Sequence, residues 1–245
     1  MSGSRSKPDY GVDAPGVARF FGIAGPLLLA WGIYGARLRL GDATIDLHGT
    51  CIATGVVFTA ESVLMLVYSK HGKFSHRERM LALHAWKGDE RVLDVGSGRG
   101  LLMIGAAKRL TTGHAEGLDI WSAKDLSGNT AGEALRNAEL EGVAERVQQH
   151  TGSIVKTDFP DGSYDVVISN LCLHNISKRA ERDAACSEIA RLLRPGGEAI
   201  ISDFKHTRQY AAVFKQAGLH VKHCGTRWLD TFPPLTVIRA VKPLA

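Results

Sequence analysis

The segment RVLDVGSGRG, residues 91–100, decides the fold class of this chain. Its apolar residues predict a buried strand over 91–95, which carries Asp94 near its end and runs into three alternating glycines. Such glycines permit positive φ and let a ligand lie against bare backbone. The apolar run from Leu101 predicts a helix, whose free N–H groups favour the polar or anionic end of a ligand. The segment therefore predicts a nucleotide-type cofactor site at the carboxyl edge of a parallel sheet.

The spacing of the glycines separates two kinds of cofactor site. A dinucleotide fingerprint is G-x-G-x-x-G, whereas this segment is G-x-G-x-G, with Leu101 at the position of the third glycine. With its acid before the first glycine, the segment resembles motif I of the class I S-adenosylmethionine (SAM)-dependent methyltransferases. Three later segments also resemble that family, in its order: AEGLDIW (115–121), DGSYDVVISNLCLHNI (161–176) and IARLLRPGGEAIISDF (189–204). The resemblance covers roughly residues 74–242.

Strand and helix patterns alternate from His76 onward, which predicts a parallel sheet covered on both faces. The resemblance implies an α/β, Rossmann-like, doubly wound fold. Its mostly parallel seven-stranded sheet would have an antiparallel last strand, and a two-helix hydrophobic segment would precede it. The expected strands are 91–95, 115–120, 147–151, 164–169, 198–203, 220–223 and 235–241.

The resemblance also implies which residues hold the cofactor, SAM. The glycine loop would cradle its amino-acid part, Asp119 would bind the ribose, and Ser153 would take the place of the family's acid near adenine. Trp121 would pack on adenine, although a core or surface role for this ring stays open. The expected cofactor-binding residues are Asp94, Gly96, Ser97, Gly98, Gly100, Asp119, Ile120, Trp121, Gly152, Ser153 and Asn170.

We expect the catalytic residues to leave little signal in the sequence. Methyl transfer requires mainly that the reactants be positioned, and it needs a base only when the nucleophile is protonated and poor. The expected catalytic residues are His174 and Asn170, in the loop after the fourth strand. His174 could act as a base or orient the acceptor, or it could only hydrogen-bond its loop. No metal is expected, because the four cysteines form no C-x-x-C pair. A soft acceptor bound by Cys172 and Cys224 is a weaker alternative.

Other polar and aromatic residues are candidates for the acceptor pocket. The long segment 121–135 could shape a lid or bind the acceptor, or it could simply cap a helix. Phe204 and His206 follow the fifth strand, and Trp228 precedes the last one; each could line the pocket or serve packing. The polar candidates in the long segment are Asp125, Ser127 and Asn129.

Two apolar runs precede the methyltransferase-like region, over residues 20–36 and 50–68, with a predicted hairpin turn between them. We divide the chain into a membrane hairpin, residues 1–73, and a methyltransferase domain, residues 74–245; the first 16 residues are interpreted as a flexible lead-in. The alternative is a pair of soluble helices that cover the domain or form a dimer interface. Glu61 favours it, because a carboxylate in lipid is costly.

Basic residues flank the two apolar runs on one side. Arg5, Lys7 and Arg19 precede them, and Lys70, Lys73, Arg77 and Arg79 follow. This bias places the catalytic domain on the cytoplasmic side. The net charge of +5 would also suit nucleic acid or anionic lipid, but no Pro-Pro-Tyr or Pro-Pro-Phe follows Asn170. That absence counts against methylation of nucleic-acid bases.

The sequence thus predicts a SAM-dependent methyltransferase acting on a small, lipophilic acceptor at a membrane. Two alternatives stay open. The chain could methylate RNA or protein, which the basic pI of about 9.1 supports. It could also be a non-catalytic SAM-binding scaffold at the membrane, although the complete glycine loop argues against lost cofactor binding.

Overall fold

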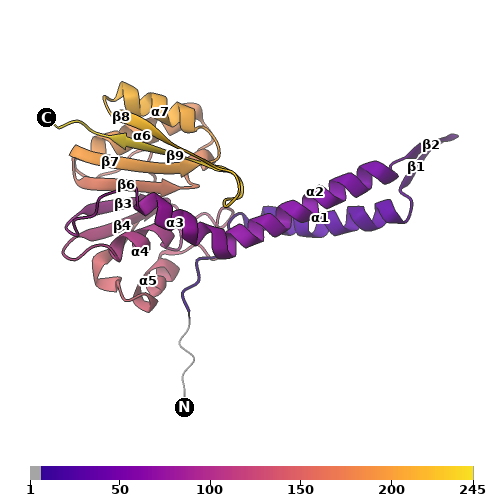
Figure 1. Ribbon diagram of the computed structural model, residues 1–245, viewed down its shortest axis with the longest axis horizontal. Coiled ribbons are helices and arrows are strands. Elements are labelled where there is room, and N and C mark those ends of the chain that lie inside the picture. Colours follow the sequence, from indigo (N-terminus) through magenta and orange to yellow (C-terminus); the bar gives the residue numbers. More distant parts are fainter. Residues whose placement is uncertain (1–6, 245) are drawn as a thin grey trace, which may run out of the picture.

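The computed structural model describes residues 7–244 and consists of a mixed α/β domain with a long helical hairpin projecting from it (Figure 1). The hairpin contains α1 and α2 and ends in the short strands β1 and β2. The helices are α1 Pro15–Ile33, α2 His48–Val67, α3 Lys73–Leu81, α4 Leu101–Ala107, α5 Ala131–Leu140, α6 Arg179–Leu192 and α7 Thr207–Gln216. The strands are β1 Arg37–Leu40, β2 Ala43–Asp46, β3 Arg91–Val95, β4 His114–Asp119, β5 Val147–Thr151, β6 Tyr164–Asn170, β7 Leu193–Asp203, β8 His220–Arg227 and β9 Leu235–Val241.

The large sheet has the order β5-β4-β3-β6-β7-β9-β8. The strands β3 to β7 pair in parallel, and β9 pairs antiparallel with both β7 and β8. This arrangement confirms the predicted fold class, including the antiparallel last strand. Three strands are longer than predicted: β6 ends at Asn170 rather than at 169, β7 begins at Leu193 rather than at 198, and β8 extends to Arg227 rather than to 223.

Each face of the sheet is covered by its own layer of helices. Successive side chains of a strand point to opposite faces, so Val92 belongs to one buried cluster and Leu93 to the other. The first cluster includes residues of α3, α4 and α5, and the second includes residues of α6 and α7. These two layers hold the carboxyl ends of the parallel strands rigidly at one edge of the domain.

The two helices of the hairpin pack closely through small residues. A Cβ added to Gly25 would lie 2.5 Å from Thr59 Oγ1, and one added to Gly55 would lie 2.7 Å from the backbone nitrogen of Leu29. The buried hydroxyl of Ser62 donates to the carbonyl of Ala18 across the interface, over 2.9 Å. Small residues and an interhelical hydrogen bond are typical of helix pairs in membranes.

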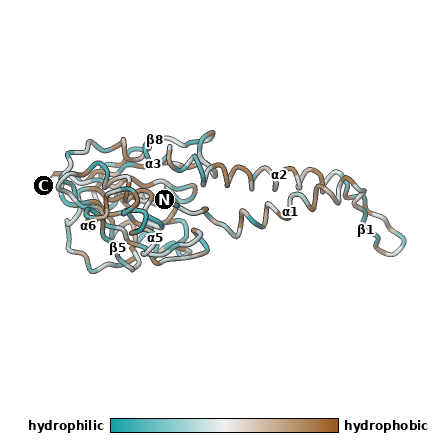
Figure 2. The backbone as a smooth tube through the Cα atoms, turned by 90° about the horizontal axis from the view of Figure 1, so that it is seen from below, coloured by the Kyte–Doolittle hydropathy of each residue, from teal (hydrophilic) through white to brown (hydrophobic). Residues whose placement is uncertain are grey.

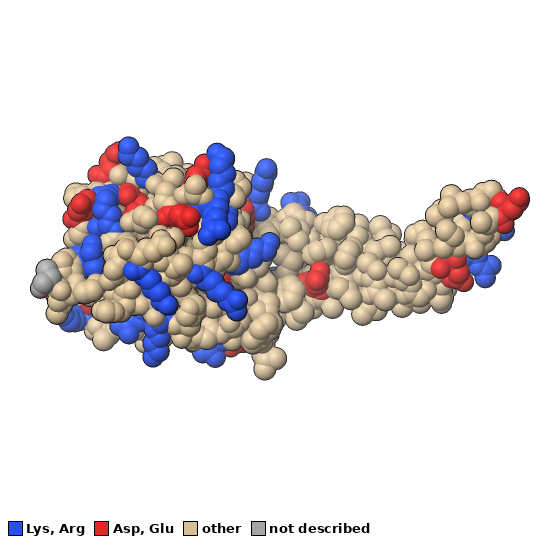
Figure 3. Space-filling view, turned by 90° about the horizontal axis from the view of Figure 1, so that it is seen from above, with Lys and Arg blue, Asp and Glu red and all other residues tan. Residues whose placement is uncertain are grey.

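The outer surface of the hairpin is apolar and exposed. Leu27, for example, is 65% exposed, and Ile23 is 64% exposed. The tube in Figure 2 is brown along much of both helices, and Figure 3 shows that charged side chains gather on the α/β domain and at the hairpin tip. Two helices in residues 7–244 are long and apolar enough to cross a membrane, a property that buried helices of soluble proteins can share. Here only 17% of each apolar window is buried.

The hairpin continues into the α/β domain without a break. A π-helical turn, Tyr68–Gly72, joins α2 to α3, so residues 48–81 form one continuous helix. The predicted division between residues 73 and 74 falls inside this helix. Lys73, which we expected among the basic residues flanking the apolar run, is only 3% exposed and points into the protein.

The segment before α1 is ordered where the structure describes it. Tyr10 is 5% exposed and packs edge-to-face on Phe74, with 5.6 Å between the ring centroids. The prediction of a flexible lead-in is therefore wrong for residues 7–14, because the polar groups of this segment find partners far along the chain. It is also wrong for residues 15 and 16, which begin α1, whereas residues 1–6, with the expected basic flank at Arg5, lie outside the described residues.

Candidate active site

A cavity of about 930 Å³ opens at the carboxyl ends of β3, β4 and β6. The strand order reverses between β3 and β6, because the chain builds outward from β3 to β5 on one side and from β6 to β7 on the other. Ligands of open α/β sheets bind at such a reversal. The cavity also extends to the base of the hairpin, where Val17 and Phe21 of α1 and Met65 of α2 line it.

The glycine loop after β3 forms the floor of the cavity. Asp94 accepts a hydrogen bond from the backbone nitrogen of Met103, over 2.8 Å, and so ties the strand to α4. Gly96 has a φ of 71°, and an added Cβ would lie 2.4 Å from Cys172 Sγ. Only glycine allows this conformation and this close approach of the two loops.

The Asp94 carboxyl is buried beneath this loop and is 2% exposed. Desolvation raises its pKa to about 7, and the negative charge of Asp119 acts in the same direction. The hydrogen bond from Met103 opposes the shift. A buried carboxyl that titrates near neutrality is typical of a ligand-binding site.

Asp119 ends β4 and fixes the second edge of the glycine loop. Its Oδ2 accepts from the backbone nitrogen of Gly98 over 2.8 Å, and its Oδ1 accepts from that of Trp121 over 2.6 Å. The side-chain nitrogen of Asn129 lies 3.3 Å from Oδ1. The carboxylate is 8% exposed and lines the cavity, so a ligand hydroxyl can reach it.

Of the residues expected near adenine, some line the cavity and one lies at the surface. Ile120, Gly152 and Ser153 line the cavity. The indole nitrogen of Trp121 instead donates to Thr151 Oγ1 over 2.8 Å, and Trp121 is not among the residues that line the cavity. This position fits the surface role that the sequence left open for Trp121.

His174 lies at the other end of the cavity, held by an acid that the sequence analysis missed. Asp203 ends β7, is fully buried, and accepts a hydrogen bond from the backbone nitrogen of His174 over 3.0 Å. His174 Nδ1 lies 2.8 Å from Asp203 Oδ1, an ion-pair distance without the alignment of a hydrogen bond. Phe204 packs edge-to-face on the imidazole at 4.5 Å and also lines the cavity. A carboxylate at a strand's carboxyl end was the signal for Asp203.

The loop between Asn170 and His174 is strained and contains unpartnered polar groups. Leu171 has a φ of 54°, an uncommon conformation for a bulky residue, and such strain concentrates at functional sites. The side-chain oxygen of Asn170 is buried, lines the cavity and has no hydrogen-bond partner within residues 7–244. Burial raises the pKa of the Cys172 thiol, so the thiol stays protonated at neutral pH.

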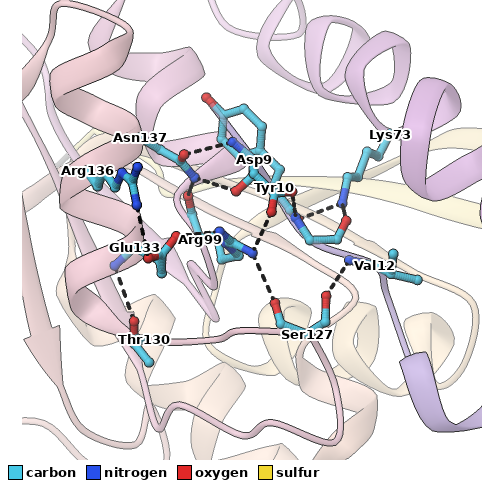
Figure 4. A network of polar contacts seen from close by, with 11 residues as sticks. Asp9, Tyr10, Val12, Lys73, Arg99, Ser127, Thr130, Glu133, Arg136 and Asn137 are labelled. Carbon is cyan, nitrogen blue, oxygen red and sulfur yellow. Dashed lines mark hydrogen bonds and ion pairs between the residues drawn. The ribbon is translucent and has the colours of Figure 1, made fainter. Parts of the chain in front are cut away.

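A second wall of the cavity comes from the start of the chain. We call residues 9–14 the N-terminal strap. The ammonium of Lys73 donates to the carbonyls of Tyr10 and Gly11, each over 2.7 Å (Figure 4). It also lies 3.4 Å from Asp13 Oδ2. Desolvation lowers the pKa of Lys73, and Asp13 opposes this shift. The buried ammonium of Lys73 therefore holds the strap against the edge of the cavity.

The strap is also tied to the loop after β4. The backbone nitrogen of Val12 donates to Ser127 Oγ over 2.8 Å (Figure 4). That of Ala14 donates to the Asp125 carbonyl over 2.8 Å. Arg99, from the glycine loop, pairs with Asp9 of the strap at 3.0 Å. The strap therefore packs on the segment that was expected to form a lid. Thr130 of that segment caps α5, because its side chain accepts a hydrogen bond from the backbone nitrogen of Glu133.

Most of the predicted site residues meet in this one cavity. Gly100, His206 and Trp228 do not line it; Gly100 instead caps α4 with a φ of 85°. Residues that sequence reasoning missed come from the strap, from α2 and α3, and from the end of β7. The expected cofactor-binding and catalytic residues that line the cavity are Asp94, Gly96, Ser97, Gly98, Asp119, Ile120, Gly152, Ser153, Asn170 and His174.

A shared role for Cys172 and Cys224 gains no support. Cys172 follows β6 and Cys224 lies in β8, three strand intervals away, which corresponds to about 14 Å. Within residues 7–244, no group of three or more histidine, cysteine or acidic side chains could hold a metal ion.

The chain is similar to known methyltransferases. Residues 93–201 match the family described as a methyltransferase domain. The chain is 28% identical over 128 residues to the ubiquinone/menaquinone biosynthesis C-methyltransferase of Roseobacter denitrificans. This alignment covers 52% of this chain and 48% of that protein. It is 32% identical over 127 residues to the demethylmenaquinone methyltransferase of Tropheryma whipplei, covering 51% and 46%. The chain thus spans about half the length of these curated relatives.

Solved structures share the fold of the α/β domain. The SAM-dependent methyltransferase from Aquifex aeolicus superposes with a TM-score of 0.53 at 18% identity. The superposition covers 67% of this chain and 88% of that one. At this identity the likeness establishes the fold alone.

Proposed function

We propose that this chain, which belongs to the class I SAM-dependent methyltransferases, transfers a methyl group from SAM to a small, lipid-soluble acceptor at a membrane. One observation carries the proposal: a single cavity runs from the glycine loop to the exposed apolar hairpin. An acceptor dissolved in a bilayer could therefore reach the reacting methyl group without crossing water. Relatives named for ubiquinone and menaquinone biosynthesis support a lipid-soluble acceptor.

The residues of the cavity fit SAM. The buried oxygens of Asn129 and Asn170 have no partner in the described part of the chain, and both residues line the cavity. They would accept from donors such as the cofactor's ammonium, hydroxyl and amino groups. An added Cβ at Gly98 would lie only 2.8 Å from the side chain of Leu126. The absence of a side chain at Gly98 therefore keeps this part of the cavity open for a ligand. We assign the ribose to Asp119 and the amino-acid part to the glycine loop and Asp94.

The chemistry of the bound cofactor is an activated methyl group on a sulfonium. The protein then needs to hold the acceptor atom close and in line, and to exclude water; good orientation contributes on the order of 7–11 kcal/mol. We assign Asn170 and the imidazole of His174 to the acceptor end of the cavity. Asp203 orients His174, which can accept a proton if the acceptor is a hydroxyl or a protonated amine.

We propose that α1 and α2 insert into the bilayer and that the domain faces the cytoplasm. The 19 residues of α1 span about 28 Å, close to the roughly 30 Å of hydrocarbon in a bilayer. The exposed apolar shaft would otherwise contact water over much of its length. The exposed basic residues Arg19 and Lys70, at the domain end of the hairpin, favour the cytoplasmic orientation.

A turnover screen with labelled SAM tests the proposal. Purified chain in lipid nanodiscs would be offered lipid extracts, phenols, thiols, amines, RNA and protein, while calorimetry with S-adenosylhomocysteine measures cofactor binding. We expect binding and label transfer into the lipid fraction. Label in RNA or protein would instead identify the alternative methyltransferases, and binding without any transfer would identify a scaffold. A folded chain that does not bind S-adenosylhomocysteine at millimolar concentration would refute the proposal.

A further inference from the structure

One charged side chain stands in the apolar part of the cavity. Glu61 is the only Asp, Glu, Lys or Arg of α2, and it lines the cavity together with Phe21 and Met65. Ser69, which lines the same cavity further along the helix, is eight residues away from Glu61. At about 1.5 Å per residue, the cavity therefore follows the helix for about 12 Å.

Three cations of the hairpin, the strap contact and the glycine loop have other partners. Arg19, the only charged residue of α1, donates to the carbonyl of Pro15 over 3.3 Å. Lys73 holds the strap and Asp13, and Arg99 pairs with Asp9 and Glu133. A partly buried carboxylate among apolar side chains is costly without a donor. The described residues thus leave Glu61 free to accept from a ligand.

We infer that Glu61 is a specificity-determining residue, which accepts a hydrogen bond from a hydroxyl or ammonium group of the lipid-soluble acceptor. This inference rests on the proposed function and adds the shape of the acceptor. Its reacting end lies near His174 and Asn170, its apolar body lies along Phe21 and Met65, and a donor group at the far end meets Glu61.

The site would discriminate against acceptors that lack the donor. A pocket that hydrogen-bonds one group of its ligand rejects an analogue without that group, because the polar atom that faces it then loses its partner. The apolar walls alone would bind a hydrocarbon and an amphiphile about equally. Glu61 is therefore the feature that selects an amphiphile.

Photocrosslinking tests this inference without requiring turnover. Three diazirine probes with the same hexadecyl chain would be used, ending in an amine, an alcohol or a methyl group. The full chain in nanodiscs, saturated with S-adenosylhomocysteine, would be irradiated, and label on the peptides containing Phe21 and Met65 would be measured. We expect the amine and alcohol probes to label these peptides about tenfold more than the alkane.

Variants of Glu61 separate the inference from its alternatives. Glu61→Leu should reduce amine and alcohol labelling to the level of the alkane, whereas Glu61→Gln should reduce amine labelling most, because its carboxamide still accepts from a hydroxyl. Asp42→Asn, at the exposed turn of the hairpin, is the matched control and should change nothing.

The outcomes distinguish this inference from the proposed function. Equal labelling by all three probes, or wild-type labelling in Glu61→Leu, would overturn the role of Glu61 even if lipid extracts are methylated. Selective labelling that depends on Glu61 would support the binding site even if the methylation screen found no lipid product. If the wild-type chain did not bind S-adenosylhomocysteine, the proposed function would be refuted instead.

Discussion

At the scale of single residues, two carboxylates hold the site. Asp94 lies under the glycine loop, where burial raises its pKa, and Asp203 accepts a hydrogen bond from the backbone nitrogen of His174. Sequence reasoning found Asp94 from its place before the first glycine. It found Phe204 but not Asp203, because only the packing of the loop after β6 against the end of β7 brings Asp203 to His174.

The stability of the ligand-free protein should depend on pH through Asp94. Its pKa is about 7 in the folded protein, against about 3.9 in an unfolded chain. The folded state thus binds this proton more tightly, so the contribution is complete below about pH 4 and is lost as pH rises through 7. We expect the Tm of Asp94→Asn to fall less than that of wild type between pH 5 and 8. Asp89→Asn, at an exposed acid, should retain the wild-type slope, and parallel curves for all three proteins would contradict the shift.

The role of His174 can be tested against its purely structural alternative. We expect His174→Ala to lower kcat by about 100-fold, the lower range for a lost acid–base group, and to leave S-adenosylhomocysteine affinity within about threefold. His206→Ala is a matched control, because His206 follows β7 but does not line the cavity. An unchanged kcat and pH profile in His174→Ala would mean that this histidine only supports its loop.

At the scale of elements, the strap joins the start of the chain to the cofactor side of the cavity. Its backbone pairs with Ser127 and Asp125, and its carbonyls receive the ammonium of Lys73. The first 16 residues are polar and contain glycine and proline, a composition that predicted a flexible lead-in. Contacts more than 50 residues apart along the chain, such as that between Tyr10 and Lys73, order it instead.

Removing the charge of Lys73 should open the strap. Lys73→Met leaves two carbonyls without their donor, at a cost of about 1–3 kcal/mol for each unsatisfied group. We expect chymotrypsin to cleave after Tyr10 faster than in wild type and the Kd for S-adenosylhomocysteine to rise about tenfold. Lys70→Met changes an exposed lysine one turn earlier and serves as control. Wild-type cleavage and affinity in Lys73→Met would show that the strap does not depend on this contact.

At the scale of the whole molecule, the hairpin and the α/β domain share one cavity. The backbone nitrogen of Asp13 donates to Ser69 Oγ over 3.1 Å, so the two points where the hairpin leaves the domain lie side by side. The hairpin can therefore be removed alone, with the strap kept in place. A deletion of residues 1–70 would remove the strap as well and would not separate the two parts.

Replacing residues 15–67 with a short Gly-Ser linker tests the role of the hairpin. We expect this variant to lose flotation with liposomes and methylation of lipid extracts, because it lacks the apolar shaft and Glu61. Its affinity for S-adenosylhomocysteine should stay within about threefold of wild type, since the glycine loop and strap remain. Wild-type flotation with the vesicles, or wild-type methylation of the lipid fraction, would contradict a membrane role for α1 and α2.

The amino-acid sequence alone determined the strands, the glycine loop and the apolar hairpin of this protein. Each of these is a local pattern: alternation in a strand, spacing of glycines, or a long apolar run within one helix. Only the tertiary structure decided that the strap covers the cavity, that Asp203 supports His174, and that Glu61 faces the same space as Asp119. These relations join residues far apart in the chain, and their partners are set by how the layers pack rather than by any pattern along the chain.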